Sequence, residues 1–164
     1  MLTGKSIFDK GIVTNADEKN IQQVGVDLRV KKIFNLDTSI GIIPKEGKTQ
    51  IPGISYESRF DGNDIGTYHL SPGYYEVVFE EGCNVPSNVA VKPFTRSSLI
   101  RCGVMCDSGV FDPGFKTDNM GCFITVLREI YIEKGARLAQ LLAFECDEVE
   151  NLYDGQFQSD KQRK

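Results

Sequence analysis

The sequence has no tryptophan, only one histidine and no long run of apolar residues. A membrane-spanning helix needs about 18 or more consecutive apolar residues, and the opening MLTGKSIFDKG lacks the apolar stretch of a secretory signal. The formal net charge of −4 argues against broad binding to duplex DNA or RNA, because such binding needs a basic surface. These absences predict a soluble, cytoplasmic protein with no membrane or nucleic-acid partner.

The cysteines form no CxxC pair, and the single histidine, His69, lies apart from them in the sequence. Structural zinc sites are built from four Cys or His ligands that usually come in closely spaced pairs. The sequence therefore predicts no zinc site and free, mostly buried thiols in a reducing compartment. The cysteines are Cys83, Cys102, Cys106, Cys122 and Cys146.

The length of 164 residues suits one domain that can bury a core without disulfides or metals. No internal repeat or low-complexity tract divides the chain. The end of the chain is polar, as mobile termini usually are. We expect a single domain over residues 1–152 and a flexible C-terminal tail over residues 153–164.

Helical periodicity is scarce after the first residues, where Thr3 or Ser6 could cap one short helix and Gly11 could end it. The apolar runs that follow are short, rich in β-branched or aromatic residues, and bounded by Gly, Pro, Asn or Asp. This pattern predicts a mainly β sandwich or barrel, with turns and irregular connections over residues 35–68. The expected strands are Val24–Val30, Tyr74–Phe79, Val89–Phe94, Phe123–Leu127 and Leu138–Phe144.

The first stretch that could carry chemistry is TRSSLIRCGV, at residues 95–104. Arg96 and Arg101 flank two adjacent hydroxyls, Ser97 and Ser98, directly after a strand-like run. Guanidinium groups match the geometry of phosphate oxygens, and hydroxyls can donate to bridging oxygens. The stretch could therefore hold a polyphosphate, or it could be a solvated surface loop.

The second stretch is SGVFDPGF, at residues 108–115, where a strand end enters a tight turn. Asp112 stands between Phe111 and Pro113, and partial desolvation there would make its carboxylate a usable base for activating water. The alternative is an aspartate that only initiates the turn before Pro-Gly.

Two further stretches place polar residues inside otherwise apolar strands: GVDLRV with Asp27 and GARLAQLL with Gln140. A buried polar side chain costs free energy unless it is paired. Asp27 and Gln140 are therefore candidates for a site, or for structural hydrogen bonds and salt bridges.

Taken together, with the order and spacing that they have in the chain, GVDLRV, TRSSLIRCGV, SGVFDPGF and GARLAQLL resemble the superfamily of dUTP diphosphatases and dCTP deaminases. The resemblance covers essentially the whole chain and includes the LSPG turn at residues 70–73 and the VP pair at residues 85–86. The opening LTGKSIFDKGIV is similar to the N-terminal helix of the deaminase branch. The resemblance implies a distorted β jelly roll, or β-clip, assembled as a homotrimer with active sites at the subunit interfaces.

On the phosphate side, the resemblance implies that Arg96, Ser97 and Ser98 contact the triphosphate and that Arg101 lies beside them. Gln140 would be a phosphate or interface ligand from a neighbouring subunit. Magnesium would bind the phosphates, with no direct protein ligand.

On the base side, the resemblance implies a hairpin pocket for base and sugar made by Gly109, Val110 and Phe111 up to the DPG turn, with Phe115 beside the deoxyribose. Asp27, in the first motif, would be structural or an indirect magnesium contact.

The tail departs from ordinary dUTP diphosphatases, because their glycine-rich closing motif is absent. Residues 153–158 resemble a shortened deaminase tail, with Gln156 where a lysine is often found. A lid built from Tyr153, Gln156, Phe157 and Gln158 could close over the nucleotide and exclude water.

The reaction class follows from one departure. Deaminases of the family carry a glutamate on the strand after the DPG turn, and its expected place, residues 120–122, holds no glutamate. Asp118 or Glu129 could serve only if the strand register shifts. Direct deamination of dCTP is therefore put in doubt.

Hydrolysis of dUTP to dUMP and pyrophosphate is the leading interpretation, since it needs only an oriented water, cations on the phosphates and magnesium. Asp112, Arg101 and Ser97 are the expected catalytic residues. Two alternatives stay open: a dCTP deaminase, alone or combined with hydrolysis, and a non-catalytic nucleotide-binding or regulatory protein.

Overall fold

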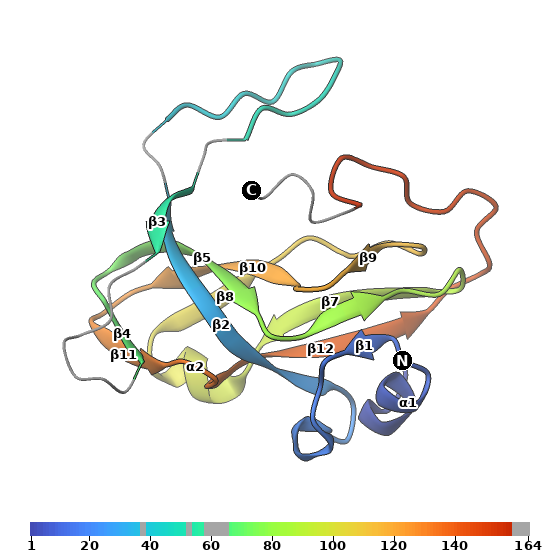
Figure 1. The fold of residues 1–164 in the computed structure, drawn as a ribbon, viewed down its shortest axis with the longest axis horizontal. Coiled ribbons are helices and arrows are strands. Elements are labelled where there is room, and N and C mark those ends of the chain that lie inside the picture. The colour runs from blue at the N-terminus through green and yellow to red at the C-terminus, as the bar shows by residue number, and fades with distance from the viewer. Residues whose placement is uncertain (37–38, 52–53, 58–65, 159–164) are drawn as a thin grey trace.

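The computed structural model describes residues 1–36, 39–51, 54–57 and 66–158, and it confirms a mainly β chain with few helices (Figure 1). None of the helices in these ranges is long and apolar enough to cross a membrane. The helices are α1 (Gly4–Asp9), the 3-10 turn η1 (Glu18–Asn20) and α2 (Ser97–Arg101). The strands are β1 (Val13–Thr14), β2 (Val26–Leu36), β3 (Ile54–Glu57), β4 (Thr67–Leu70), β5 (Gly73–Phe79), β6 (Gly82–Asn84), β7 (Val89–Thr95), β8 (Val104–Asp107), β9 (Lys116–Thr117), β10 (Gly121–Val126), β11 (Ile130–Glu133) and β12 (Arg137–Glu145).

The N-terminal helix begins and ends where its sequence predicts. The Thr3 side chain accepts a hydrogen bond from the Ser6 amide at 3.2 Å, which satisfies one of the free amides of the first turn. Gly11 has a φ of 64° directly after the helix, a conformation that glycine adopts at little cost. Ile7 faces inward and is fully buried.

The largest sheet in the described part of the chain has the strand order β7-β12-β2-β5-β10-β8, with β3 paired to β2. Every pairing in it is antiparallel. Two smaller sheets, β1-β6-β9 and β11-β4, complete the fold. The jelly-roll topology expected from the resemblance and the trimeric assembly remain predictions.

All five expected strands are present, but β2 continues past Val30 to Leu36. A register shift between Val30 and Lys32 in its pairing with β5 interrupts the alternation that marks a strand, which hid the second half of β2. The expectation of irregular chain over residues 35–68 is wrong where β3 and the start of β4 fall. Residues 37–38, 52–53 and 58–65 of that segment lie outside the described residues.

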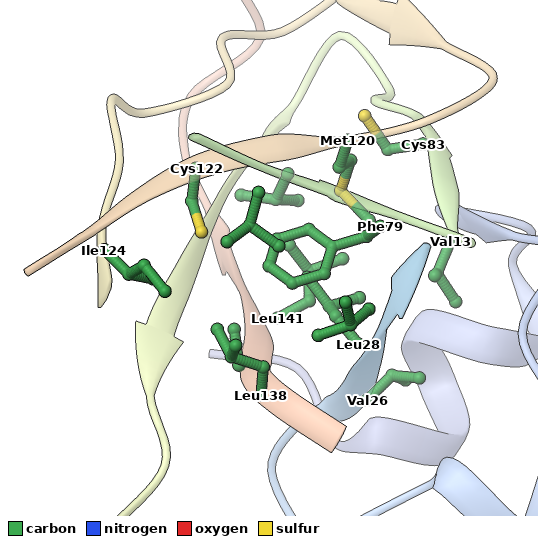
Figure 2. Packing of buried hydrophobic residues seen from close by; sticks show 14 of the residues in the cluster. Val13, Val26, Leu28, Phe79, Cys83, Met120, Cys122, Ile124, Leu138 and Leu141 are labelled. Carbon is green, nitrogen blue, oxygen red and sulfur yellow. The ribbon is translucent and has the colours of Figure 1, made fainter. Parts of the chain in front are cut away.

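The core combines side chains of the main sheet with residues of α1, β1 and β6. Figure 2 shows Phe79 among Leu28, Leu141 and Met120, which come from different strands and turns. Phe79 is fully buried, and burying such a side chain stabilises the fold by about 1.5–3 kcal/mol. The core thus joins β5 to β2 and β12, the two strands that carry Asp27 and Gln140.

Arg29, the second polar residue of GVDLRV, forms an ion pair with the buried Glu81. Glu81 is fully buried, and its carboxylate accepts hydrogen bonds from Arg29 Nε at 2.6 Å and from the Arg29 amide at 2.7 Å. Arg29 also donates to Asp17 at 2.6 Å and to the Asn15 carbonyl at 2.9 Å. Burial raises the pKa of Glu81, and the bonds from Arg29 oppose that rise. Arg29 therefore holds the fold together and is committed to these partners.

Candidate functional site

The two polar residues that stand inside apolar strands lie opposite each other. Asp27 on β2 is the register partner of Gln140 on β12, and Gln140 is also opposite Phe94 on β7. Residues directly opposite in a sheet point to the same face. The stretches GVDLRV and GARLAQLL therefore meet on one face, next to the end of β7.

Asp27 is the centre of a charged cluster on that face. Its side chain is 1% exposed, and its oxygens lie 3.2 Å from Arg96 Nε and 3.3 Å from an Arg137 Nη1. Arg96 Nη1 also donates a hydrogen bond to the Arg137 carbonyl at 2.8 Å. We call Asp27, Arg96, Arg137 and Gln140 the arginine cluster. Its guanidinium groups are held in place before any ligand arrives.

The Asp27 carboxylate is not fully satisfied by these neighbours. Burial raises its pKa, whereas the charges of Arg96 and Arg137 lower it by a smaller amount. Oδ1 is buried and accepts no aligned hydrogen bond from the described residues, although Arg96 Nε is close to it. Oδ1 is thus paired with Arg96 by charge but lacks an aligned hydrogen bond.

Arg137 is the member of the cluster that sequence reasoning missed. It stands three residues before Gln140 in GARLAQLL. A cation this near to a polar residue in the same strand was the signal that could have added Arg137 to the predicted site. A strict alternation would place Arg137 on the opposite face from Gln140, but a register shift between Arg137 and Ala139 breaks it. Only the folded strand shows that the two side chains belong to one site.

The hydroxyls of Ser97 and Ser98, in TRSSLIRCGV, stand at the beginning of α2. Arg96 is the N-cap residue, and Ser97 and Ser98 are exposed in the first turn. Arg101 lies in the last turn and is exposed as well. The structure therefore places Ser97 and Ser98 next in the chain to the arginine cluster and open to solvent, as phosphate contacts require.

The DPG turn is well formed but more open than expected. The Phe115 amide donates to the Asp112 carbonyl at 3.0 Å, and Gly114 has a φ of 89°. Phe111 stacks on Phe115 with ring centroids 5.1 Å apart. Asp112 is exposed in the single chain, so the expected desolvation is wrong for one copy alone. Phe111 packs against the core, and Asp112 stays in solvent.

The loop before this turn is also open. Gly109 and Val110 are exposed, whereas Phe111 is partly buried and its backbone bridges that of Val91 on β7. This leaves main-chain groups of residues 109–110 accessible, as a pocket that reads a base edge through its backbone requires.

Asp112 and Arg96 lie apart within one chain. Phe111 is anchored at Val91, whereas Arg96 follows the far end of β7. At 3.2–3.4 Å per residue, five residues of strand span about 16 Å. In Figure 1, α2 lies in the left-hand half of the view and β9, which follows the DPG turn, lies in the right-hand half.

The tail packs on the DPG turn of its own chain. The Tyr153 amide donates to the Pro113 carbonyl at 2.9 Å, and Gln158 Nε2 donates to the Gly114 carbonyl at 3.0 Å. The Tyr153 ring meets Phe115 edge-on, with centroids 5.4 Å apart. Gln156 is partly buried and Phe157 is exposed. The predicted tail residues up to Gln158 are thus brought to the base side of the site.

A polar cavity elsewhere contains none of the predicted catalytic or nucleotide-binding residues. It has a volume of about 560 Å³ and lies beyond Arg29 along β2. Asp118, one of the two recruitable acids, lines it, and Glu129 is exposed between β10 and β11. The cavity is lined by Asn15, Arg29, Lys31, Glu80, Asp118, Asn119, Lys134 and Gly135.

The expected place of the deaminase glutamate is apolar. Met120 and Cys122 are both buried in the core, as Figure 2 shows. Further along β10, Phe123 is opposite Glu76 on β5, a buried carboxylate that sequence reasoning did not single out. Its signal was a lone acid inside the apolar run YYEVVF.

Comparison with known proteins places these observations in a family. The family model described as dCTP deaminase-like matches residues 5–146. The deoxyuridine 5'-triphosphate nucleotidohydrolase of Methanocaldococcus jannaschii is 35% identical over 153 residues, which are 93% of each chain. A probable enzyme of the same name from Halobacterium salinarum is 36% identical over 148 residues, covering 89% of this chain and 87% of the relative.

Among solved structures, the 2'-deoxycytidine 5'-triphosphate deaminase of Agrobacterium tumefaciens has a similar fold, with a TM-score of 0.62 at 17% identity. The match covers 85% of this chain but only 45% of the deaminase chain, so this chain spans less than half of that protein's length. The family match and the relatives confirm the resemblance seen in the motifs. The chain belongs to the dCTP deaminase-like family.

Proposed function

We propose that this protein hydrolyses dUTP to dUMP and pyrophosphate. The observation that carries the proposal is the arginine cluster beside Ser97 and Ser98, together with an open DPG turn that presents Asp112. Relatives at 35% and 36% identity carry the name deoxyuridine 5'-triphosphate nucleotidohydrolase, and β10 offers no glutamate at the position where deamination needs one. The described residues, which include all five cysteines, contain no disulfide, which suits a cytoplasmic enzyme.

In the proposed reaction, Arg96, Ser97 and Ser98 bind the phosphates, and Arg101 adds positive charge beside them. Asp112 accepts a proton from a water molecule whose oxygen attacks the α-phosphorus. The bond from the α-phosphorus to the bridging oxygen breaks, and pyrophosphate leaves. Positive groups fixed before the reaction stabilise the charge that develops on the phosphates without having to reorganise.

Magnesium fits this arrangement through the nucleotide. Mg²⁺ is usually bound by one or two carboxylates, several waters and substrate phosphates. Asp27, whose Oδ1 lies 3.2 Å from Arg96 Nε without an aligned hydrogen bond, is proposed to contact the ion only indirectly, through such a water. Within the described ranges, no group of three or more His, Cys, Asp or Glu residues gathers as a metal cage. When bound, the ion would offset negative charge on the phosphate oxygens.

The proposed enzyme is a homotrimer whose sites lie between subunits. Asp112 and Arg96 stand at opposite ends of β7 in one chain, so a DPG turn can serve an arginine cluster only if it belongs to a neighbouring copy. A closed ring of three identical copies makes three such sites by one repeated contact. The neighbour would also cover Asp112, which supplies the desolvation that the single chain lacks.

The tail is proposed to act as a lid over the nucleotide. Truncation after Asn151 removes every tail residue that docks on the DPG turn, and it is expected to lower kcat/KM for dUTP by at least about tenfold, because the site would stay open to water. A chain ending after Gln158 keeps the described residues that dock on the DPG turn, Tyr153 and Gln158 among them, and should retain wild-type kinetics. Equal activity of the two truncated chains would exclude the lid.

The test of the proposed function is to incubate the purified protein and magnesium separately with dUTP and dCTP, and to measure dUMP, pyrophosphate and ammonia. Release of dUMP and pyrophosphate from dUTP without ammonia from dCTP is expected. Ammonia from dCTP would favour the deaminase alternative and would make Glu76 the first residue to replace. Binding of both nucleotides without turnover would favour the regulatory alternative.

A further inference from the structure

The two end strands of the main sheet, β7 and β8, lie against each other at a seam. In the described part of the chain they share no backbone ladder. Pro93, near the end of β7, has no N–H to donate to such a ladder. Side-chain hydroxyls make the contacts across the seam instead.

Thr95 makes two of these contacts with one hydroxyl. Its Oγ1 accepts a hydrogen bond from the Cys106 amide at 2.8 Å and donates one to the Cys106 carbonyl at 3.1 Å. Ser108 Oγ donates to the Pro93 carbonyl at 3.2 Å. The Thr95 hydroxyl thus replaces a complete backbone donor and acceptor pair, which only a hydroxyl can do from this position.

The place of this contact links it to the proposed phosphate site. Thr95 is the last residue of β7 and directly precedes Arg96, whose side chain must reach Asp27 on β2. On its other side, Thr95 is paired with Ala139 on β12, next to Gln140. Thr95 is therefore held from both sides at the point where the chain leaves the sheet and turns into α2.

We propose that Thr95 is a positioning residue that sets the direction in which Arg96 and Ser97 leave β7, and so controls how tightly the triphosphate is bound. This inference rests on the proposed function, because it assigns Thr95 to the same site. Thr95 itself touches no substrate. Without its two bonds to Cys106, the N-terminus of α2 can move away from Asp27, and the site loses the preorganisation of its cations.

The test compares Thr95→Val, which keeps the shape but removes both hydrogen bonds, with Thr95→Ser, which keeps the hydroxyl. Binding of dUMP and of the non-hydrolysable triphosphate dUpNHpp is measured for each, with kcat and KM for dUTP. Thr95→Val should weaken dUpNHpp binding by about tenfold more than dUMP binding. The reason is that the two hydrogen bonds from Thr95 to Cys106, which hold the residues proposed to bind the triphosphate, are lost. Thr95→Ser should bind both nucleotides with affinities within about twofold of wild type, because its hydroxyl can still make both hydrogen bonds.

A matched control is Ser87→Ala. Ser87 also uses its hydroxyl in a bond to another segment, Glu148 at 3.2 Å, but it precedes β7 at the end away from Arg96. This variant should bind both nucleotides as wild type does. The melting temperature of every variant is measured to separate loss of binding from loss of folding.

Equal weakening of dUMP and dUpNHpp by Thr95→Val would reduce the role of Thr95 to stability and overturn the inference, as would binding identical to wild type. If Thr95→Val does not fold, Thr95→Cys decides, because its thiol is a weaker donor of similar size; an unchanged ratio of the two affinities would then reject the inference. Failure of the wild-type protein to hydrolyse dUTP would instead reject the proposed function.

Discussion

Replacing Asp112 by asparagine is expected to abolish dUTP hydrolysis while leaving nucleotide binding nearly unchanged. Asparagine has the same shape and keeps the turn, because the bond that closes it runs from the Phe115 amide to the Asp112 main-chain carbonyl. The amide cannot take a proton from water, and general-base catalysis contributes about 10²–10⁴-fold to rate. We expect the rate constant measured in single-turnover assays to fall by about 10²-fold or more.

Asp118→Asn is the matched control for this prediction. Asp118 is another exposed carboxylate, six residues further along the chain, and it lines the polar cavity beyond Arg29. Its replacement should leave kcat unchanged, and dUpNHpp should bind both variants as it binds wild type. Undiminished turnover in the Asp112 variant would remove Asp112 from the mechanism and leave the DPG turn a purely structural feature.

Much of the fold follows from local signals in the sequence. The Thr3 cap, the Gly11 stop and the alternating strand runs each need only nearby residues to be recognised, and all are found where expected. The second half of β2 was missed because a register shift after Val30 breaks the period of two. Strand signals fail at such irregularities because pairing with neighbours, not local pattern, then decides the conformation.

The site could be predicted only in part, because its members meet through strand register. Asp27 and Gln140 were site candidates because they are polar residues in apolar strands. Their direct pairing joins segments far apart in the sequence, so no local pattern predicts it. Arg137 gave only the weak signal of a cation near Gln140, and its contact with Asp27 depends on the irregularity in β12. Arg29 and Asp27 are two residues apart in one motif, yet Arg29 binds Glu81 and Asp27 binds Arg96 and Arg137, which no local pattern could distinguish.

The separation of Asp112 from Arg96 leads to a sharper expectation for the assembly. Asp112→Asn and Arg96→Gln should each be inactive alone, and mixing the two should restore activity once subunits exchange. A site that takes Arg96 from an Asp112→Asn chain and Asp112 from an Arg96→Gln chain is intact. With equal amounts and random mixing, half of the chains supply a sound Arg96 and half of the neighbours supply a sound Asp112, so about a quarter of wild-type activity should return.

The control for this recovery is a mixture of Asp112→Asn chains with chains that carry both substitutions, since no pairing of these two can build an intact site. Subunit exchange is verified by native mass spectrometry of mixed oligomers. If exchange occurs and the first mixture stays as inactive as the control, both groups must act within one chain. The chain would then have to bring the two ends of β7 to one nucleotide, which the anchoring of Phe111 at Val91 and of Arg96 at Asp27 opposes. Recovery near a quarter would instead fix the catalytic unit as the contact between two copies.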